Sequence, residues 1–325
     1  MPELSIIMPL LNTVRYVGLA IQSILTQSYT DFELIIVNDA SSDSSLEIVQ
    51  SFKDERIRIF SNVRNQGIVF SRNLGLNAAQ GRYIAPFDSD DIAMPCKFRK
   101  QLDFLNSHPD FGMIGTWARM IDEEGTVLNR KWKLSASPKH IPAIMLFRNY
   151  FVQSSLVIRR EAIPEGGYAA GFEIGEDYNM WNQVIRKHKV WNYPEYLVQY
   201  RIHNKGVSQQ NTERLAEYEG KLLKLIFKPY GISIDDHLAE LLLLVKNGDT
   251  IKQAETLIEI ERFLLQLLER NQKLLLVDQR ALIKVVTNRW IKTCYLARRQ
   301  FPAVQTKLFT SKLSRILIRN LCRIQ

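Results

Sequence analysis

Three carboxylates fall within four consecutive residues, Asp88-Ser89-Asp90-Asp91, directly after an apolar run that ends at Phe87. Like charges this close repel one another unless a cation neutralises them. Mg²⁺ and similar hard cations bind one or two carboxylates together with substrate phosphate oxygens. The segment is therefore suited to anchor a metal ion and a diphosphate. A solvated acidic loop that caps the following helix is the alternative, because such short patterns are common.

Two further acidic sites stand at the ends of predicted elements. Asp39 follows the apolar run 32–37, where a hydrogen-bond acceptor at the end of a strand suits the reading of a base N–H group. An Asx turn that leads into the next helix is the alternative for Asp39. Glu176 and Asp177 begin an amphipathic segment, where acids ordinarily complement the helix dipole.

Alternating strands and helices are expected to position these acids. Apolar runs predict strands at 5–8, 32–37, 57–60 and 82–87, and apolar spacing predicts helices at 15–27 and 67–79. Ser44 and Glu47 match a capping box for another helix. Strands that alternate with helices at this spacing form parallel βαβ units, which bind ligands beyond the carboxyl ends of their strands.

The second half of the chain changes character near residue 210. Before it, we expect a helix at 96–107, strands near 113–121 and 153–159 with a turn at 122–125, a helix at 176–187 and a strand at 196–203. After it, leucine-rich helices are predicted at 212–228, 236–247, 251–271, 278–300 and 304–323. We therefore expect a catalytic domain at 1–210, with halves at 1–92 and 93–210, and a helical region at 211–325.

Composition and charge narrow the class of protein. The 325 residues are 46% hydrophobic, carry a net charge of +9 and include only three cysteines, which argues against a disulfide framework. Residues 270–325 hold thirteen basic residues and one acidic residue, so residues 1–269 are slightly acidic. This placement argues against a nucleic-acid-binding fold. Without a signal peptide or an apolar span, we expect a cytoplasmic protein.

Six separated motifs together resemble inverting family 2 glycosyltransferases of the bacterial type that builds cell-surface polysaccharide. The donor-side motifs are SIIMPLLN at 5–12, LIIVNDASSD at 34–43, NQG at 65–67 with SRNLG at 71–75, and RYIAPFDSDDI at 82–92. The acceptor-side motifs are GEDYNMW at 175–181 and YRIH at 200–203, followed by Val207-Ser208. The resemblance implies a GT-A fold, a Rossmann-like mixed α/β sheet flanked by helices, followed here by an α-helical C-terminal region.

The resemblance also implies roles on the donor side. Asp39 matches the carboxylate that accepts a hydrogen bond from the uracil of a UDP-sugar, and Asp88 matches the first acid of the D-x-D pair, facing ribose or metal. Asp90 matches the second acid, which binds the Mn²⁺ or Mg²⁺ that bridges the diphosphate. Arg72 matches a basic position near the nucleotide, with a surface arginine on a helix as the alternative. Within the same motifs, we expect Pro9, Asn12 and Ser89 to line the nucleotide-sugar site.

On the acceptor side, Asp177 matches the general base and Glu176 is the alternative base. Trp181 would stack on a sugar or pack in the core. His203 would bind the metal or a phosphate, or be structural, and Arg201 beside it would support the site. Asp91 would share metal binding or cap the following helix. The chain departs from the family pattern at Leu11, where an aromatic residue is common, and at Asn38, where an aspartate is common.

The sequence thus predicts an inverting, metal-dependent transferase that moves a hexosyl or N-acetylhexosaminyl group from a nucleotide-sugar donor to a saccharide or lipid-linked saccharide. A catalytically degenerate scaffold and a sugar nucleotidyltransferase are the alternatives. The nucleotidyltransferase lacks support because no glycine-rich, basic loop follows the first strand. Near the C-terminus, apolar and basic residues segregate at helical spacing. We expect this helix to lie on the anionic inner face of the cell membrane or to pack on protein, including a second subunit.

Overall fold

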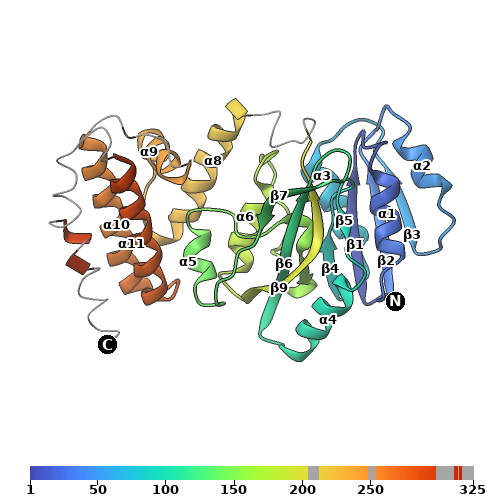
Figure 1. Ribbon diagram of the computed structural model, residues 1–325, viewed down its shortest axis with the longest axis horizontal. Helices are drawn as coiled ribbons and strands as arrows, with labels where there is room; N and C mark the ends of the chain where they lie inside the picture. Colours follow the sequence, from blue (N-terminus) through green and yellow to red (C-terminus); the bar gives the residue numbers. More distant parts are fainter. Residues whose placement is uncertain (204–211, 248–250, 252–253, 298–310, 314, 317–325) are drawn as a thin grey trace. The chain divides into compact units, whose positions relative to one another are not determined.

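The computed structural model describes residues 1–203, 212–247, 251, 254–297, 311–313 and 315–316 (Figure 1). The chain divides into two compact units. Unit 1 comprises residues 1–138 and 150–211, and unit 2 comprises residues 139–149 and 212–325. The division differs from the single boundary expected from the sequence, because residues 139–149 cluster with the C-terminal helices.

A mixed sheet forms the centre of unit 1, with nine strands among the described residues (Figure 1). The strands are β1 (Leu4–Leu10), β2 (Phe32–Asn38), β3 (Ile57–Ser61), β4 (Tyr83–Pro86), β5 (Ile92–Ala93), β6 (Phe111–Ile121), β7 (Val127–Trp132), β8 (Val157–Arg159) and β9 (Lys189–Arg201). Their order is β3-β2-β1-β4-β8-β6-β9-β5, and β7 pairs with β6. The helices are α1 (Val17–Leu25), α2 (Ser45–Ser51), α3 (Ile68–Ala78), α4 (Lys97–Ser107) and α6 (Glu176–Val184).

The parallel part of the sheet, β3-β2-β1-β4, is covered on both faces. Alternate residues such as Ile6 and Leu34 pack with α1, α2 and α4, whereas their neighbours Ile7 and Ile35 pack with the side of α3. Burial on both faces explains why β1, β2 and β4 are largely apolar in sequence. Gly75 lets α3 approach the sheet, because a Cβ atom there would collide with the Ile7 side chain.

Most of the predicted elements of unit 1 are confirmed, with four corrections. The predicted strand 153–159 is wrong in its first half, where Gln153–Ser155 form a 3₁₀ turn ahead of β8. The last strand starts at Lys189 rather than at residue 196, and β7 and the short β5 were not predicted. The capping box is also wrong. Ser44 makes no side-chain cap, and Asp43 Oδ1 instead accepts from Ser45 N at 3.0 Å.

Unit 2 is helical and has a core of its own. Its helices are α5 (Ile141–Met145), α8 (Thr212–Phe227), α9 (Asp236–Asn247), α10 (Ala254–Leu274) and α11 (Gln279–Ala297), with a 3₁₀ turn at Lys228–Tyr230. Phe227 packs edge-on against Phe263 and Phe147, which explains why residues 139–149 belong to this unit. None of the described helices combines the length and the hydropathy needed to cross a bilayer.

The predicted C-terminal helix lies mostly outside the described residues. Of its apolar positions, Leu313 is described and is 1% exposed, and its amide donates to Glu261 Oε1 of α10 at 3.3 Å. Ser311 Oγ accepts from Trp290 Nε1 of α11 at 3.1 Å. At residues 311–313 the segment therefore packs on protein, one of the two alternatives expected from the sequence.

Candidate active site

The carboxyl ends of three parallel strands meet at one edge of the sheet. Leu10 at the end of β1 pairs with Asn38 at the end of β2, and Ile7 pairs with Pro86 at the end of β4. Thr13 Oγ1 donates to Ser89 Oγ at 3.1 Å, which joins the loop after β1 to the loop after β4. The acids that follow β2 and β4 therefore stand at the same edge, as the strand pattern predicts.

Asp90 and His203 meet at this edge. His203 Nε2 lies 2.8 Å from Asp90 Oδ2, and the imidazole packs on the Tyr16 ring at a centroid distance of 5.1 Å. The contact joins residues 113 positions apart and brings the predicted metal-binding histidine to the D-x-D segment. The structure thus gathers Asp88, Asp90 and His203, which the sequence placed in two separate motifs.

The side chains at this edge fit a metal ion whose remaining ligands would come from the substrate. Within the part of the chain that the structure describes, no three acidic, histidine or cysteine side chains are arranged to hold a metal by themselves. Mg²⁺ and Mn²⁺ favour oxygen ligands, and Mg²⁺ sites commonly combine one or two carboxylates with substrate phosphates. Asp88 and Asp90, with the His203 imidazole beside them, supply that partial set, and phosphate oxygens would supply the rest.

Asp91 is fully buried, unlike its neighbours. Its Oδ1 accepts from the Arg201 amide at 2.9 Å, and Arg201 Nε donates to the Asp90 carbonyl at 2.9 Å. Arg201 also donates to the carbonyls of Asp122 and Glu123. Arg201 therefore fixes the backbone of the acidic segment. The predicted helix cap by Asp91 is wrong, because α4 has Cys96 at its N-cap position.

Replacing Asp91 with asparagine should stabilise the protein above neutral pH. Burial, with the nearby carboxylates of Asp90 and Asp88, holds the pKa of Asp91 well above its usual range. Because the folded state binds the proton more tightly, this group costs stability as pH rises from its unfolded pKa of about 4 towards the folded pKa. Asp91→Asn keeps the acceptor for Arg201 and removes that cost, so its melting temperature at pH 8 should exceed the wild-type value by about 2 to 6 °C.

Thermal melts between pH 5 and 8 without divalent cations would measure this effect. Asp103→Asn, at an exposed position on α4, is the matched control and should follow the wild type at each pH. A lower melting temperature for Asp91→Asn than for the wild type at pH 8 would contradict the assignment of a buried carboxylate with a raised pKa.

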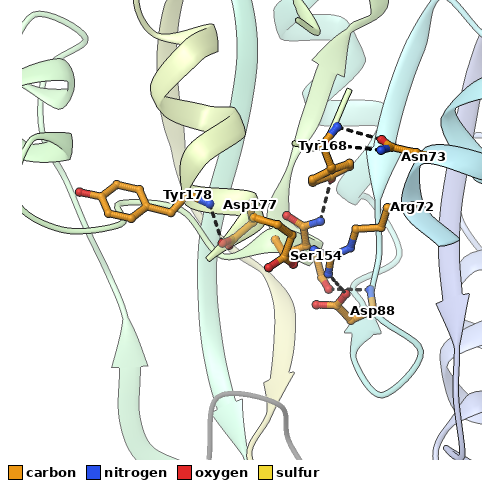
Figure 2. Close-up of polar contacts among 9 residues, drawn as sticks. Arg72, Asn73, Asp88, Ser154, Tyr168, Asp177 and Tyr178 are labelled. Atoms are coloured by element: carbon orange, nitrogen blue, oxygen red, sulfur yellow. Dashed lines mark hydrogen bonds and ion pairs between the residues drawn. The ribbon is translucent and has the colours of Figure 1, made fainter. Parts of the chain in front are cut away.

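Arg72 lies between two acids from different parts of the chain, as Figure 2 shows for Asp88. Its Nη2 atom is 2.9 Å from Asp88 Oδ1, and its Nη1 atom pairs with Glu176 Oε1 at the start of α6. The Arg72 side chain is only 7% exposed, so the alternative of a surface arginine is wrong. Because both terminal nitrogens bind carboxylates, the geometry favours a role in holding these acids, and direct contact with a diphosphate stays a prediction.

The electrostatics of this buried group reflect strong opposing effects. Burial by itself lowers the pKa of Arg72, but Glu176 and Asp88 outweigh it and the pKa is raised. Burial raises the pKa of Glu176 to about 7, against the opposing effect of Arg72. Burial also raises the pKa of Asp88, while Arg72 lowers it and Asp90 adds to the rise. A cation or a proton at this edge is therefore favoured.

Asp177 is placed beside this group by the first turn of α6. Gly175, in the left-handed region with a φ of 76°, forms the N-cap of the helix, and Tyr178 N donates to Asp177 Oδ1 at 2.6 Å (Figure 2). Asp177 is half-buried, whereas Glu176 is buried against Arg72. Burial is the main cause that raises the pKa of Tyr200, and the carboxylates of Asp91, Asp88, Asp90 and Asp177 raise it further. Since Arg72 pairs with both Asp88 and Glu176, the two acidic motifs meet in one region of unit 1.

Asp39 organises the loop ahead of α3. Its Oδ1 accepts from Asn62 Nδ2 at 2.7 Å and from Gln66 N at 2.8 Å, and its Oδ2 accepts from Gly67 N at 2.8 Å. A carboxylate has about four acceptor positions, so one remains on Oδ2. The alternative of an Asx turn at Asp39 is wrong, because both of its oxygens accept from residues 62–67 and neither accepts from the backbone directly after Asp39. Recognition of a base by Asp39 stays a prediction.

The remaining donor-side candidates line the same strand ends. Pro9 is buried in β1 opposite Val37, and Ser89 is 6% exposed. Asn12, with a φ of 52°, accepts from Ser42 N at 2.8 Å, so it joins the loops after β1 and β2. These positions are next to the acidic segment, and their contact with a nucleotide stays a prediction.

Trp181 and several unpredicted residues support the site from within. Trp181 is fully buried and packs edge-on against Tyr168, so its burial favours core packing over stacking on a sugar. Ser154 Oγ accepts from the Asp88 amide at 3.0 Å, and Asn73 pairs with both backbone polar groups of Tyr168 (Figure 2). The polar pair Gln153-Ser154 inside an apolar segment was the one signal in the sequence that could have revealed Ser154.

Lys97, also unpredicted, is buried at the start of α4 beneath the acidic segment. Its Nζ atom lies 4.2 Å from the centroid of the Phe98 ring and 5.9 Å from that of Phe87. Burial holds the pKa of Lys97 well below its usual range. The sequence gives no sign of this, because a lysine at the first position of an amphipathic helix ordinarily faces solvent.

Comparison with known proteins places the chain among glycosyltransferases. Residues 5–167 match the family described as Glycosyl transferase family 2. The O-antigen biosynthesis glycosyltransferase WbnJ of Escherichia coli is 34% identical over 227 residues, which cover 66% of this chain and 85% of that protein.

Solved structures show the same fold at low sequence identity. The crystal structure of S. aureus TarS 1-349 in complex with UDP-GlcNAc matches with a TM-score of 0.57 and 16% identity, over 94% of this chain and 92% of that one. Mannosyltransferase PcManGT from Pyrobaculum calidifontis, in complex with GDP-Man and Mn²⁺, matches with a TM-score of 0.54 and 15% identity, over 96% and 88%. The fold is GT-A, as the motifs imply. With the family match and the relative in E. coli, these findings show that the chain is a glycosyltransferase and belongs to glycosyl transferase family 2.

Proposed function

We propose that this glycosyltransferase is inverting and metal-dependent, and that it moves a hexosyl or N-acetylhexosaminyl group from a UDP-sugar to a saccharide or lipid-linked saccharide during surface polysaccharide synthesis. The observation that carries the proposal is the set of contacts that gathers the acids of the site in unit 1: His203 lies against Asp90, and Arg72 joins Asp88 to Glu176, the residue next to Asp177. The names of the relatives support it. WbnJ is named for O-antigen biosynthesis, and TarS has been crystallised with UDP-GlcNAc.

The donor end of the reaction belongs to the acidic segment. Asp88 and Asp90, with His203, would hold Mn²⁺ or Mg²⁺ together with the diphosphate. The bound cation would stabilise the negative charge that develops on the leaving diphosphate. The complex of PcManGT with GDP-Man and Mn²⁺ supports this assignment. Asp39 would accept a hydrogen bond from the base through the acceptor position that remains on Oδ2.

The acceptor end of the reaction belongs to Asp177. Its carboxylate takes the proton of the acceptor hydroxyl as that oxygen attacks the anomeric carbon from the face opposite the nucleotide. The bond between the anomeric carbon and the diphosphate oxygen breaks, and its electron pair leaves with the diphosphate. One displacement without a covalent intermediate inverts the anomeric configuration. Arg72 positions the acids of both the donor side and the acceptor side, since it pairs with Asp88 and with the residue next to Asp177.

Location at the membrane is part of the proposal. A lipid-linked acceptor is at the bilayer, and the excess of basic residues after residue 270 suits an anionic surface. We therefore propose that the enzyme acts as a peripheral protein on the cytoplasmic face of the cell membrane.

A screen of nucleotide-sugar hydrolysis tests the proposed reaction without knowledge of the acceptor. Among common donors, one UDP-sugar should be hydrolysed when Mn²⁺ or Mg²⁺ is present, and chelation of the metal should abolish the activity. Asp90→Asn should lower the rate about 10- to 100-fold, because it weakens the ligand set. Glu124→Gln, at an exposed acid of the neighbouring turn, is the control and should leave the rate unchanged. Hydrolysis that is equally fast in a chelator would contradict metal dependence.

A further inference from the structure

Three consecutive leucines are exposed in the turn between α10 and α11. Leu274, Leu275 and Leu276 are 47%, 71% and 43% exposed. Most other leucines of the same two helices are buried, as Leu267 and Leu282 are with 0% exposure. Single exposed apolar residues need no explanation, but a contiguous apolar patch on a surface usually marks a contact.

Hydrogen bonds hold this turn in a defined conformation. Asn271 is fully buried, its Nδ2 donates to Val277 O at 2.9 Å, and its Oδ1 accepts from Val277 N at 3.0 Å. Leu275 N donates to Asn271 O at 2.7 Å, and Leu275 has a φ of 52°, which side-chain-bearing residues rarely adopt. Asp278 Oδ1 then accepts from Ala281 N at 2.8 Å at the start of α11. The leucines therefore point outward from an ordered turn, and fraying does not explain their exposure.

Basic side chains surround the leucines on both helices. Arg270 and Lys273 come from the end of α10, Arg280 and Lys284 come from the start of α11, and all four are exposed. Lys273 pairs with Glu269 at 2.8 Å, and between residues 270 and 284 the only acidic residue in the sequence is Asp278, which caps α11, so basic residues remain in excess around the leucines. Lysine is depleted in interfaces between proteins, whereas leucines bordered by lysine and arginine are typical of segments that lie on anionic lipid. The chemistry of the patch thus favours a membrane over a protein partner.

We propose that the α10–α11 turn inserts Leu274, Leu275 and Leu276 into the surface of an anionic lipid bilayer, with the surrounding arginine and lysine side chains on the lipid headgroups. The proposal deepens the membrane location proposed above and assigns it to residues other than the C-terminal helix. It does not depend on the donor or on the chemistry of the active site. Binding to lipid and hydrolysis of a nucleotide sugar therefore fail independently.

Sedimentation of the full chain with vesicles tests the insertion. The wild type should bind vesicles of equal parts phosphatidylcholine and phosphatidylglycerol, and bind phosphatidylcholine vesicles weakly. Leu275→Asp should lower the partition coefficient about ten- to hundredfold, because it replaces one buried leucine side chain by a charge. Ile258→Asp is the matched control, since Ile258 is 46% exposed on α10 and lies outside the turn. It should bind as the wild type does.

A separate pair of variants tests the basic residues around the leucines. Arg280→Gln with Lys284→Gln should lower binding to the anionic vesicles about ten- to thirtyfold, since each basic residue near the surface contributes to attraction. Arg130→Gln with Lys131→Gln, at exposed positions of β7, removes the same charge and should have little effect.

Two results would overturn the proposal. One is binding of Leu275→Asp to anionic vesicles at the wild-type level. The other is a wild type that does not bind vesicles and is dimeric, as measured by light scattering, while Leu275→Asp is monomeric. That result would make the turn an interface between proteins. Hydrolysis of the nucleotide sugar at the wild-type rate by Leu275→Asp, measured without lipid, verifies that the variant is folded. If the wild type hydrolyses no donor, the proposed function fails while the vesicle result still stands.

Discussion

An Asp177→Asn variant should lose glycosyl transfer by about 10²- to 10⁴-fold while it binds the nucleotide sugar as tightly as the wild type. Asparagine keeps the oxygen that accepts from Tyr178 N, so the first turn of α6 is retained. It cannot take the proton of the acceptor hydroxyl, which is the role proposed for Asp177. Steady-state kinetics with the donor and its acceptor, together with calorimetry of donor binding, would separate the two effects.

Glu176→Gln is the variant that discriminates between the two acids of the motif. Glu176 is buried against Arg72 and Asp177 is half-buried, so the structure favours Asp177 for contact with an acceptor. Glu176→Gln should retain transfer to a greater extent than Asp177→Asn. Full turnover by Asp177→Asn, with loss of turnover in Glu176→Gln, would assign the base to Glu176 instead.

An Arg72→Met variant should lose about 3 to 5 kcal/mol of folding free energy, because it leaves two carboxylates of the site without their cation. Glu176 and Asp88 both pair with this guanidinium, and Glu176 has almost no access to solvent. Urea unfolding would measure the loss. Arg15→Met is the control. Arg15 pairs with Glu123 at the surface, where its side chain is 57% exposed, so its loss should lower the stability far less than the loss of Arg72 does.

A second substitution verifies the cause of that destabilisation. In the double variant Arg72→Met with Glu176→Gln, one of the two unpaired charges is gone, so a large part of the lost stability should return. Coupling between the two sites by a double-mutant cycle is the quantity to measure. Additive losses, with no coupling between residues 72 and 176, would contradict the buried ion pair as the link between the donor and acceptor motifs.

The parallel strands of unit 1 were predictable because they are buried on both faces. Residues 34–37 form a continuous apolar run, and the helices around them have clear apolar spacing. The strand segments that were missed lack this signal. The unpredicted first part of β9 begins with a polar residue, Lys189, and contains Pro194, while β7 is largely exposed with few apolar residues. The capping box failed because Ser44 makes no side-chain cap, and the preceding Asp43 instead accepts from the first amide of the helix, Ser45 N.

The acids of the site were predictable for a different reason. Each follows a strand or begins a helix, so the local sequence places it at the edge where parallel strands end. The pairing of Arg72 with Glu176 was not predictable, since the two residues are 104 apart. His203 was expected near the metal-binding acids only through the family resemblance, since it is 113 residues from Asp90. Burial likewise depends on the tertiary fold. Trp181 and Arg72 are both buried, which favours core packing for Trp181 and excludes a surface position for Arg72.

Calorimetric titration of UDP into the full chain, with Mn²⁺ and then with a chelator, tests the central proposal most directly. If Asp88, Asp90 and His203 hold a cation that bridges the diphosphate, UDP should bind at least about tenfold more tightly with Mn²⁺. Asp90→Asn should remove that difference, and Glu124→Gln should preserve it. Equal affinity with and without the metal, or no binding of UDP or any other nucleoside diphosphate, would contradict the account.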